Sequence, residues 1–238
     1  NIISNHWPAF MLADSSLPTG SFAHSSGLEV AHQLGMLKTA EEVKAFVLAS
    51  IQSNLQQQLG FVHQSYHLAQ LSDDQEFLNC YQQLDNTLNS YLRTNDLSCE
   101  ASIDQGLGLL RVAIAWSRNW NDKNATQKLK LLRDSLNKDQ GHLSPIWGVV
   151  TALMGIASPE EAGKLWGYTM ARDMVSAAVR LNAVGPLASL EILDQAQTVV
   201  HTCVEEADNS LEKVGSCFPL LDTIFPCHDL LAVRLFRT

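Results

Sequence analysis

The clearest helix in the sequence is Ser158-Pro-Glu-Glu-Ala-Gly-Lys-Leu-Trp-Gly-Tyr-Thr-Met-Ala-Arg-Asp-Met-Val-Ser-Ala-Ala-Val-Arg-Leu181. Ser158 is a residue type that caps helices, Pro159 is tolerated in a first turn, and the two glutamates that follow favour the positive end of the helix dipole. Apolar side chains then recur at the spacing of one helix face: Trp166, Met170, Met174, Ala177 and Leu181. Gly185-Pro186 predicts the end of this helix, because proline cannot continue the hydrogen-bond ladder.

Similar helix signals recur on both sides of this stretch. Thr39-Ala-Glu-Glu42 has the form of a capping box, Asp73 with Glu76 opens another helix, and a further helix begins at about Leu187. A third apolar stripe consists of Ile103, Leu107, Leu110 and Ile114. No segment shows the sustained alternation of a strand. We therefore predict an all-α protein in which residues 1–238 form a single domain, a compact array of packed helices with no sheet.

The charge of the chain argues against a nucleic-acid partner. The formal net charge is −9, and the 16 basic residues form no dense stripe of the kind that neutralises phosphates. The longest basic cluster, Lys128, Lys130 and Arg133, is interpreted as one solvated helix face. Charged residues make up only 17% of the chain, against about 25% in a typical soluble protein. Such a surface suits permanent burial against other proteins, although a bland neutral surface explains it equally well.

Cysteine usage and hydropathy predict a cytoplasmic protein. The five cysteines are odd in number and mostly far apart, no secretory signal precedes them, and no apolar run approaches the roughly 18 residues of a membrane span. We expect reduced thiols and no membrane association. Because the sequence begins at Asn1 without a methionine, an N-terminal piece that includes any targeting segment can be missing.

Common catalytic signatures are absent from the sequence. It contains no phosphate loop of the Gly-x-x-x-x-Gly-Lys-Ser/Thr type, no His-Glu-x-x-His zinc helix and no Gly-x-Ser-x-Gly elbow. The weak metal candidates His63 and His67 are four residues apart on one predicted helix face, or are simply two unrelated polar positions. Two other groupings of possible ligands are better explained as packed thiols or as side chains on different helix faces: Cys217 with Cys227-His228, and His201 with Cys203.

A second unusual segment is Asp14-Ser-Ser-Leu-Pro-Thr-Gly-Ser-Phe-Ala-His-Ser-Ser-Gly-Leu-Glu29. Its proline and glycines allow a turn of defined shape, and the chain then enters a helix at about Ser26. A helix-capping turn that seals the core explains these residues without any function. Asp14, His24 and Glu29 add polar groups, and if any of these groups is exposed, His24 and Glu29 are the first candidates.

This segment resembles the N-terminal signature of the urease accessory protein UreF family. Other matches follow in the family's order: Arg93 to Gly106, Gly141-His-Leu-Ser-Pro-Ile-Trp-Gly148, Ala178-Val-Arg-Leu-Asn-Ala-Val-Gly-Pro186, and the ending His228…Arg234-Leu-Phe-Arg-Thr238. Together they cover essentially the whole chain. The run from Arg172 to Leu181 is more similar to eukaryotic members, plant-like ones especially, than to typical bacterial ones.

The resemblance implies a function as well as an all-helical fold. Members of the family form dimers and are not enzymes. They bridge a UreD-type accessory protein, called UreH in some species, to the GTP-hydrolysing protein UreG, and the assembly delivers nickel to apo-urease. The implied partners are therefore these two proteins, apo-urease and a second copy of the chain. No cofactor is expected to be bound stably, since the complex handles the nickel.

The residues that we expect to contact partners lie in the matching blocks: His24, Glu29, His142, Arg180, Arg234, Leu235, Phe236 and Arg237. His142 is as well explained by a role at a helix end, and Arg180 by an internal salt bridge or carbonyl contact. Residues 234–238 combine an aromatic anchor with flanking arginines, and chain ends can become ordered on binding, so we expect them to dock the UreD-type partner.

Two alternatives remain open for the function. In the first, the chain regulates GTP hydrolysis by UreG, with Arg180 or Arg237 acting as an arginine finger. In the second, His63, His67 or His142 holds nickel in transit.

Overall fold

The computed structural model describes residues 2–19, 23–120, 124–207, 211 and 218–237. Within these ranges the chain is helical and contains no strand, which confirms the all-α prediction. The helices in chain order are α1 (Ile2–Leu12), α2 (Leu28–Gln33), α3 (Ala40–Leu68), α4 (Asp74–Leu92), α5 (Asp96–Trp116), η2 (Ser117–Asn119), α6 (Ala125–Ser135), α7 (Leu143–Met154), α8 (Pro159–Arg180), α9 (Pro186–Glu205), α10 (Pro219–Ile224) and η4 (Phe225–Leu230).

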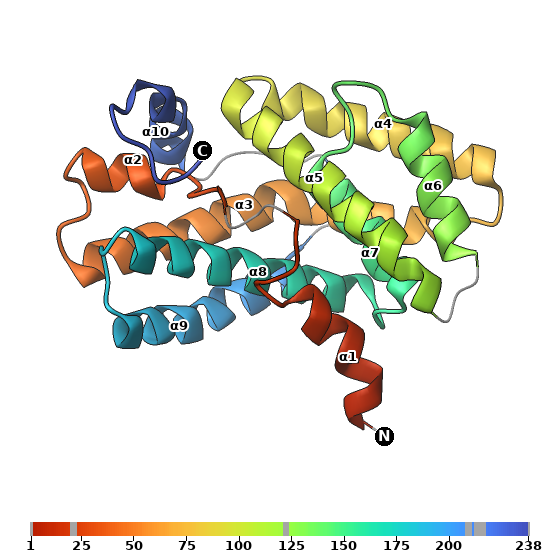
Figure 1. The fold of residues 1–238 in the computed structure, drawn as a ribbon, viewed down its shortest axis with the longest axis horizontal. Helices are drawn as coiled ribbons and strands as arrows, with labels where there is room; N and C mark the ends of the chain where they lie inside the picture. The colour runs from red at the N-terminus through yellow and green to blue at the C-terminus, as the bar shows by residue number, and fades with distance from the viewer. Residues whose placement is uncertain (1, 20–22, 121–123, 208–210, 212–217, 238) are drawn as a thin grey trace.

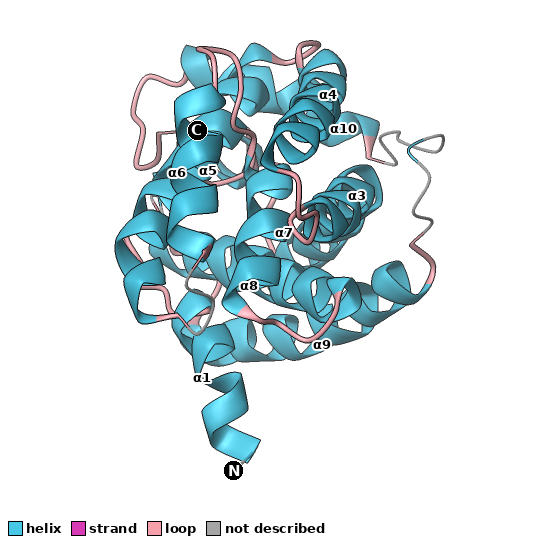
Figure 2. Ribbon diagram, turned by 90° about the vertical axis from the view of Figure 1, so that its right-hand side faces the viewer, coloured by secondary structure: helices cyan, strands magenta, loops and turns pink. Residues whose placement is uncertain are grey.

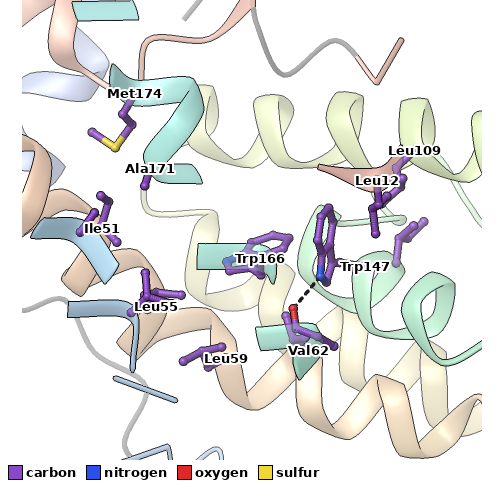
Figure 3. Packing of buried hydrophobic residues seen from close by; sticks show 14 of the residues in the cluster. Leu12, Ile51, Leu55, Leu59, Val62, Leu109, Trp147, Trp166, Ala171 and Met174 are labelled. Carbon is purple, nitrogen blue, oxygen red and sulfur yellow. Dashed lines mark hydrogen bonds between the residues drawn. The ribbon is translucent and has the colours of Figure 1, made fainter. Parts of the chain in front are cut away.

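The long helix α3 lies in the middle of the body, and α7, α8 and α9 pack against it (Figures 1 and 2). Two tryptophans join α7 and α8 in the core (Figure 3). The indole N–H of Trp147 donates to the carbonyl oxygen of Ala162 at 3.0 Å, and the Trp147 and Trp166 rings meet edge to face with centroids 5.4 Å apart. Burial of such large rings makes this the apolar centre of the fold.

The helix starts predicted from the sequence are confirmed. The Thr39 hydroxyl accepts from the Glu42 N–H, and the Glu42 carboxylate accepts from the Thr39 N–H, which completes the capping box. Asp73 caps α4, and the Ser158 hydroxyl accepts from the Glu161 N–H at the start of α8. Each cap satisfies backbone donors that the first helical turn leaves without partners.

Two interpretations of helix faces need correction. Of the stripe predicted on α5, Leu110 is buried but Ile103, Leu107 and Ile114 are only half-buried, because the buried line runs one residue to the side and includes Leu109. Lys128 is not part of a solvated face: its Nζ donates to the Leu71 carbonyl oxygen, and it lies 4.7 Å from the centroid of the Phe77 ring. Lys130 and Arg133 of the same cluster are exposed, as expected.

α1 points away from the body of the protein at the N-terminal end (Figures 1 and 2). At the opposite side, the last described residues lie beside α2 and α10. Among the described helices, none combines the length and the apolar character that crossing a bilayer requires.

Candidate functional site

The candidate site is the junction between α2 and the C-terminal segment, which we define as residues 229–237. The turn before α2 is held in left-handed backbone conformations at Ser26 (φ 53°) and Gly27 (φ 80°). A Cβ on Gly27 would also come within 3.0 Å of the Leu221 side chain, so α10 packs directly on this turn. Glycine thus meets both a backbone and a space requirement here.

At the centre of the junction lies the carboxylate of Glu29, whose residue is only 1% exposed. Its Oε1 accepts from the backbone N–H of Leu235 at 2.6 Å, and its Oε2 accepts from that of Phe236 at 3.1 Å. His228 Nε2 lies 3.3 Å from Oε2, and Gln33 Nε2 donates to Oε1 at 3.3 Å. A buried carboxylate is tolerated only with donors of this kind, and such bonds are stronger than those between neutral groups.

Further contacts hold the C-terminal segment on both sides of Glu29. Gln33 Nε2 also donates to the carbonyl oxygen of Val233 at 2.9 Å, and the backbone N–H of Arg237 donates to Ala23 O at 2.7 Å. Phe236 is 4% exposed and lies under the guanidinium of Arg180, which is 4.3 Å from the ring centroid. This stacking is a cation–π contact between α8 and the segment.

The charged side chains around the junction are paired. Arg237 reaches Asp104 of α5 at 2.8 Å, and Arg234 folds back onto Asp229 at 3.0 Å. His24 is 8% exposed, and its pKa is lowered to about 4 by burial first and by the nearby Arg237 charge second. The imidazole of His24 is therefore neutral near pH 7.

The structure brings together almost all of the residues that the sequence singled out for partner contact. The exception is His142; the others meet at the junction: His24, Glu29, Arg180, Arg234, Leu235, Phe236 and Arg237. Their partner contacts remain predictions. The chain's own body buries His24, Glu29 and Phe236, so none of the three presents its side chain freely to a partner.

Apolar side chains stand outward on the same two segments. On the C-terminal segment, Leu230 is 83%, Val233 is 74% and Leu235 is 52% exposed, and in the turn after α2 Leu34 and Met36 are exposed. Leu34 directly follows Gln33, which bonds the Val233 carbonyl oxygen, so the two sets adjoin. We call these five residues the junction surface. An apolar surface beside a polar rim is typical of a protein-binding site.

His142 lies elsewhere, in a buried polar network where α4, α5 and α7 meet. Its ring nitrogens are 3.2 Å from the Ser102 hydroxyl and 3.3 Å from Asn89 Oδ1. The residue is fully buried, and burial lowers its pKa to about 4. Direct partner contact by this ring would therefore require the chain to open, and the helix-end role fits its position.

Sequence reasoning missed Asp85, which anchors this network. Its carboxylate accepts from the backbone N–H groups of Gly141 at 2.8 Å and His142 at 3.0 Å, at the start of α7. Burial raises the pKa of Asp85 to about 6, although the two backbone donors lower it. Its sequence signal is weak, because an acid in the middle of α4 looks like a solvated position.

The metal candidates do not gather into a site. His63 is buried and His67 is exposed, although both belong to α3. Among the described residues there is no group of three or more His, Cys, Asp or Glu side chains that could hold a metal ion. Cys227 is half-buried and His228 is committed to Glu29, while Cys217 lies outside the described residues. His201 is exposed and Cys203 buried, as expected for residues two apart on a helix.

The described surface also contains two larger hollows. A groove of about 1300 Å³ runs between α1, the end of α7, α8 and α9, with an apolar floor that includes Leu153, Leu165 and Leu193. A smaller hollow of about 280 Å³ beside α3, α4 and α5 is lined largely by amide and hydroxyl side chains. None of the described residues that line this second hollow is acidic, a histidine or a cysteine.

The sequence was also compared with known protein families and proteins. The family model described as UreF matches residues 37–197. The Urease accessory protein F of rice (Oryza sativa subsp. japonica) is 34% identical over 233 residues, which are 98% of this chain and 85% of the rice protein. That of Arabidopsis thaliana is 34% identical over 235 residues, 97% of this chain and 91% of its own length.

A bacterial relative is also similar along its whole length. The urease accessory protein UreF of Trichodesmium erythraeum is 28% identical over 247 residues, 98% of this chain and 97% of that protein. The higher identity to the two plant proteins confirms the plant-like character expected from the sequence. The family model stops short of the junction at both ends, but these alignments span nearly all of the chain. The chain therefore belongs to the UreF family of urease accessory proteins.

Proposed function

We propose that this chain acts in urease maturation as a non-catalytic scaffold in the cytoplasm. On this proposal it joins a UreD/UreH-type accessory protein to the GTPase UreG, and the assembly inserts nickel into apo-urease. The observation that carries the proposal is the junction, where a buried carboxylate holds the C-terminal segment so that the five side chains of the junction surface face outward. Such a surface fits docking by a protein partner better than small-molecule chemistry.

The first test concerns the role in urease maturation. Cells that lack this chain should contain urease protein that is nickel-poor and inactive, and expression of the chain should restore both nickel and activity. Fully active urease in the deletion strain would sink the proposal.

The second test concerns the junction surface. Val233→Asp places a charge on a 74% exposed side chain without touching a buried one, so the fold should persist while co-purification with one of the two accessory partners is lost. Leu187→Asp is the matched control, since Leu187 is an 84% exposed apolar residue of α9 and is not part of the junction surface. Truncation of residues 234–238 is a harsher version, because it also removes the buried Phe236.

We include self-association in the proposal and assign it to the groove beside α8 and α9. Trp7 and Phe10 of α1 are both 59% exposed next to it, and Pro8 and Ala9 form part of its wall. The same face thus carries both projecting aromatic side chains and an apolar hollow. In a dimer with a two-fold axis, the aromatic side chains of each copy can fill the apolar hollow of the other copy.

A second candidate function is regulation of GTP hydrolysis by UreG. Arg237 favours it, because its side chain is 69% exposed and its ion pair with Asp104 lies at the surface. Arg237→Ala would then slow GTP turnover in the complex without weakening assembly. If the variant instead assembled more slowly and hydrolysed GTP at the normal rate, regulation would be excluded and the scaffold role would be the one that remains.

Nickel is proposed to be handled by the complex rather than held stably by this chain. Within the described residues, no group of three or more His, Cys, Asp or Glu side chains forms around His63 and His67, which supports this view. Equilibrium dialysis of the purified chain against Ni²⁺ should show no tight site, and stoichiometric retention would favour a transit role instead.

A further inference from the structure

The hydrogen bonds of the Glu29 carboxylate do more than satisfy a buried charge, because they also constrain the backbone of the C-terminal segment. Its donors include the backbone N–H groups of two successive residues, Leu235 and Phe236, one to each oxygen. In an extended strand successive N–H groups point to opposite sides. Both can reach one carboxylate only if the backbone bends there, so the bend and the two bonds depend on each other.

This bend sets which side chains of the C-terminal segment face outward. Leu235 is 52% exposed, whereas the next side chain, Phe236, is 4% exposed and packs under Arg180. A slip of one residue along the carboxylate would exchange these two positions. Glu29 therefore fixes the register of the segment as well as its attachment.

The helix α2, which carries Glu29, is too short to be stable by itself. α2 has only 6 residues, and it follows two residues in left-handed conformations. An isolated helix of this length is unstable in water. Gln33, one turn after Glu29, bonds both the Glu29 carboxylate and the Val233 carbonyl oxygen. α2 and the C-terminal segment thus order each other.

We propose that Glu29 is the positioning residue for docking of the UreD/UreH-type partner: its carboxylate fixes the bend and register of residues 233–237, and thereby presents the junction surface in its binding form. This inference rests on the proposed docking role of that surface. The segment behaves as an internal ligand of α2, and the site on α2 accepts two successive backbone N–H groups flanked by an apolar side chain.

The direct test is Glu29→Gln, which keeps the size of the side chain. The amide can accept one backbone N–H, but its NH2 group then faces the other donor, which leaves that donor without an acceptor. Hydrogen exchange of the isolated chain should show the Leu235 and Phe236 amides exchanging at least about tenfold faster, as expected when a charge-assisted bond is lost. The affinity of the chain for the UreD/UreH-type partner should fall by a similar factor, while the helix content stays unchanged.

Two other variants complete the design. Glu191→Gln on α9 is the control for loss of a carboxylate, since Glu191 is exposed and accepts from Gln195 of its own helix at 3.4 Å. Leu235→Pro removes the N–H donor on the C-terminal segment instead of the Glu29 acceptor, because proline has no N–H. This variant tests the same contact if Glu29→Gln does not fold. A synthetic peptide of residues 234–238 should restore partner binding to a chain truncated after Val233, but not when that chain also carries Glu29→Gln.

The outcomes separate this inference from the proposed function. Unchanged protection of the two amides in Glu29→Gln overturns the inference, as does faster exchange with full partner affinity. If the unaltered chain binds neither accessory partner, the proposed function fails. The exchange measurement, which needs no partner, then still decides whether Glu29 holds the segment.

Discussion

Gly148 lies so close to Val62 that a Cβ on the glycine would come 2.2 Å from the Val62 carbonyl oxygen and 2.1 Å from the Ser65 hydroxyl. The backbones of α3 and α7 therefore touch at this point, in the middle of the core. No side-chain rotation can relieve a clash with a backbone oxygen. The small residue is what allows these two helices to share one layer of packing.

Gly148→Ala should consequently destabilise the protein by about 3 kcal/mol or more, because the overpacked helices must separate. Chemical denaturation followed by circular dichroism measures this. Gly185→Ala serves as the control: Gly185 has an ordinary backbone conformation and nothing within 4 Å of its Cβ position, so the free energy of unfolding should hardly change. Equal stability of the two variants would contradict the close approach.

Asp85→Ala should cost about 2–4 kcal/mol, since it leaves the Gly141 and His142 N–H groups buried without an acceptor. The start of α7 should loosen first, which hydrogen exchange of residues 141–144 would detect. Asp134→Ala is the comparison, because Asp134 has only an exposed pair with its neighbour Arg133 and such pairs contribute little. A cost at Asp85 no larger than at Asp134 would count against the anchoring role.

Stability should fall in mild acid because of His142. Its folded pKa of about 4 lies below the ordinary value of 6.5, so folding favours the neutral ring. The corresponding stability is complete above pH 6.5 and is lost as the pH falls toward 4. Between pH 7.5 and pH 5 the loss from this residue is about 2 kcal/mol.

The measurement is the free energy of unfolding at the two pH values for the unaltered chain and for His142→Gln, whose pH dependence should be smaller by that amount. His24, with its pKa also near 4, adds a loss of the same sign. Asp85 acts in the opposite direction, because its raised pKa makes stability fall as the pH rises through 6. An identical pH dependence in His142→Gln would show that the ring is not buried as described.

The groove beside α8 and α9 leads to a prediction about oligomeric state. Leu190→Asp puts a charge on a 63% exposed side chain of that groove, so a dimer formed there should dissociate to monomers in light scattering. Leu230→Asp, at an 83% exposed leucine of the junction surface, should leave the dimer intact. A monomeric unaltered chain, or a dimer that survives Leu190→Asp, would remove this face from the proposal.

The sequence predicted best those features that depend on near neighbours. The caps at Thr39, Asp73 and Ser158 involve residues two or three positions away, and they appear in the structure as expected. The face of α8 was also predictable, because Trp166 and Met174 stand out by size and helical spacing. Local chemistry fixes both kinds of feature.

Features that depend on distant partners were not predictable in this way. Glu29 looks like an ordinary first-turn acid of a short helix, and its burial follows from donors 206 and 207 residues further along the chain. Lys128 looks like part of a basic face until the connection after α3 supplies the Leu71 carbonyl oxygen. Tertiary contacts decide the position of both side chains, and the spacing of residues along a helix does not reveal such contacts.

The Glu29 contact also imposes an order on biosynthesis. Its donors are among the last residues of the described chain to be synthesised, so the nascent helical body can assemble well before α2 has anything to hold. A polypeptide interrupted shortly before residue 235 could bury most of its core and still lack the bend at the junction. Recognition through this surface would then act as a check that translation has run past that point.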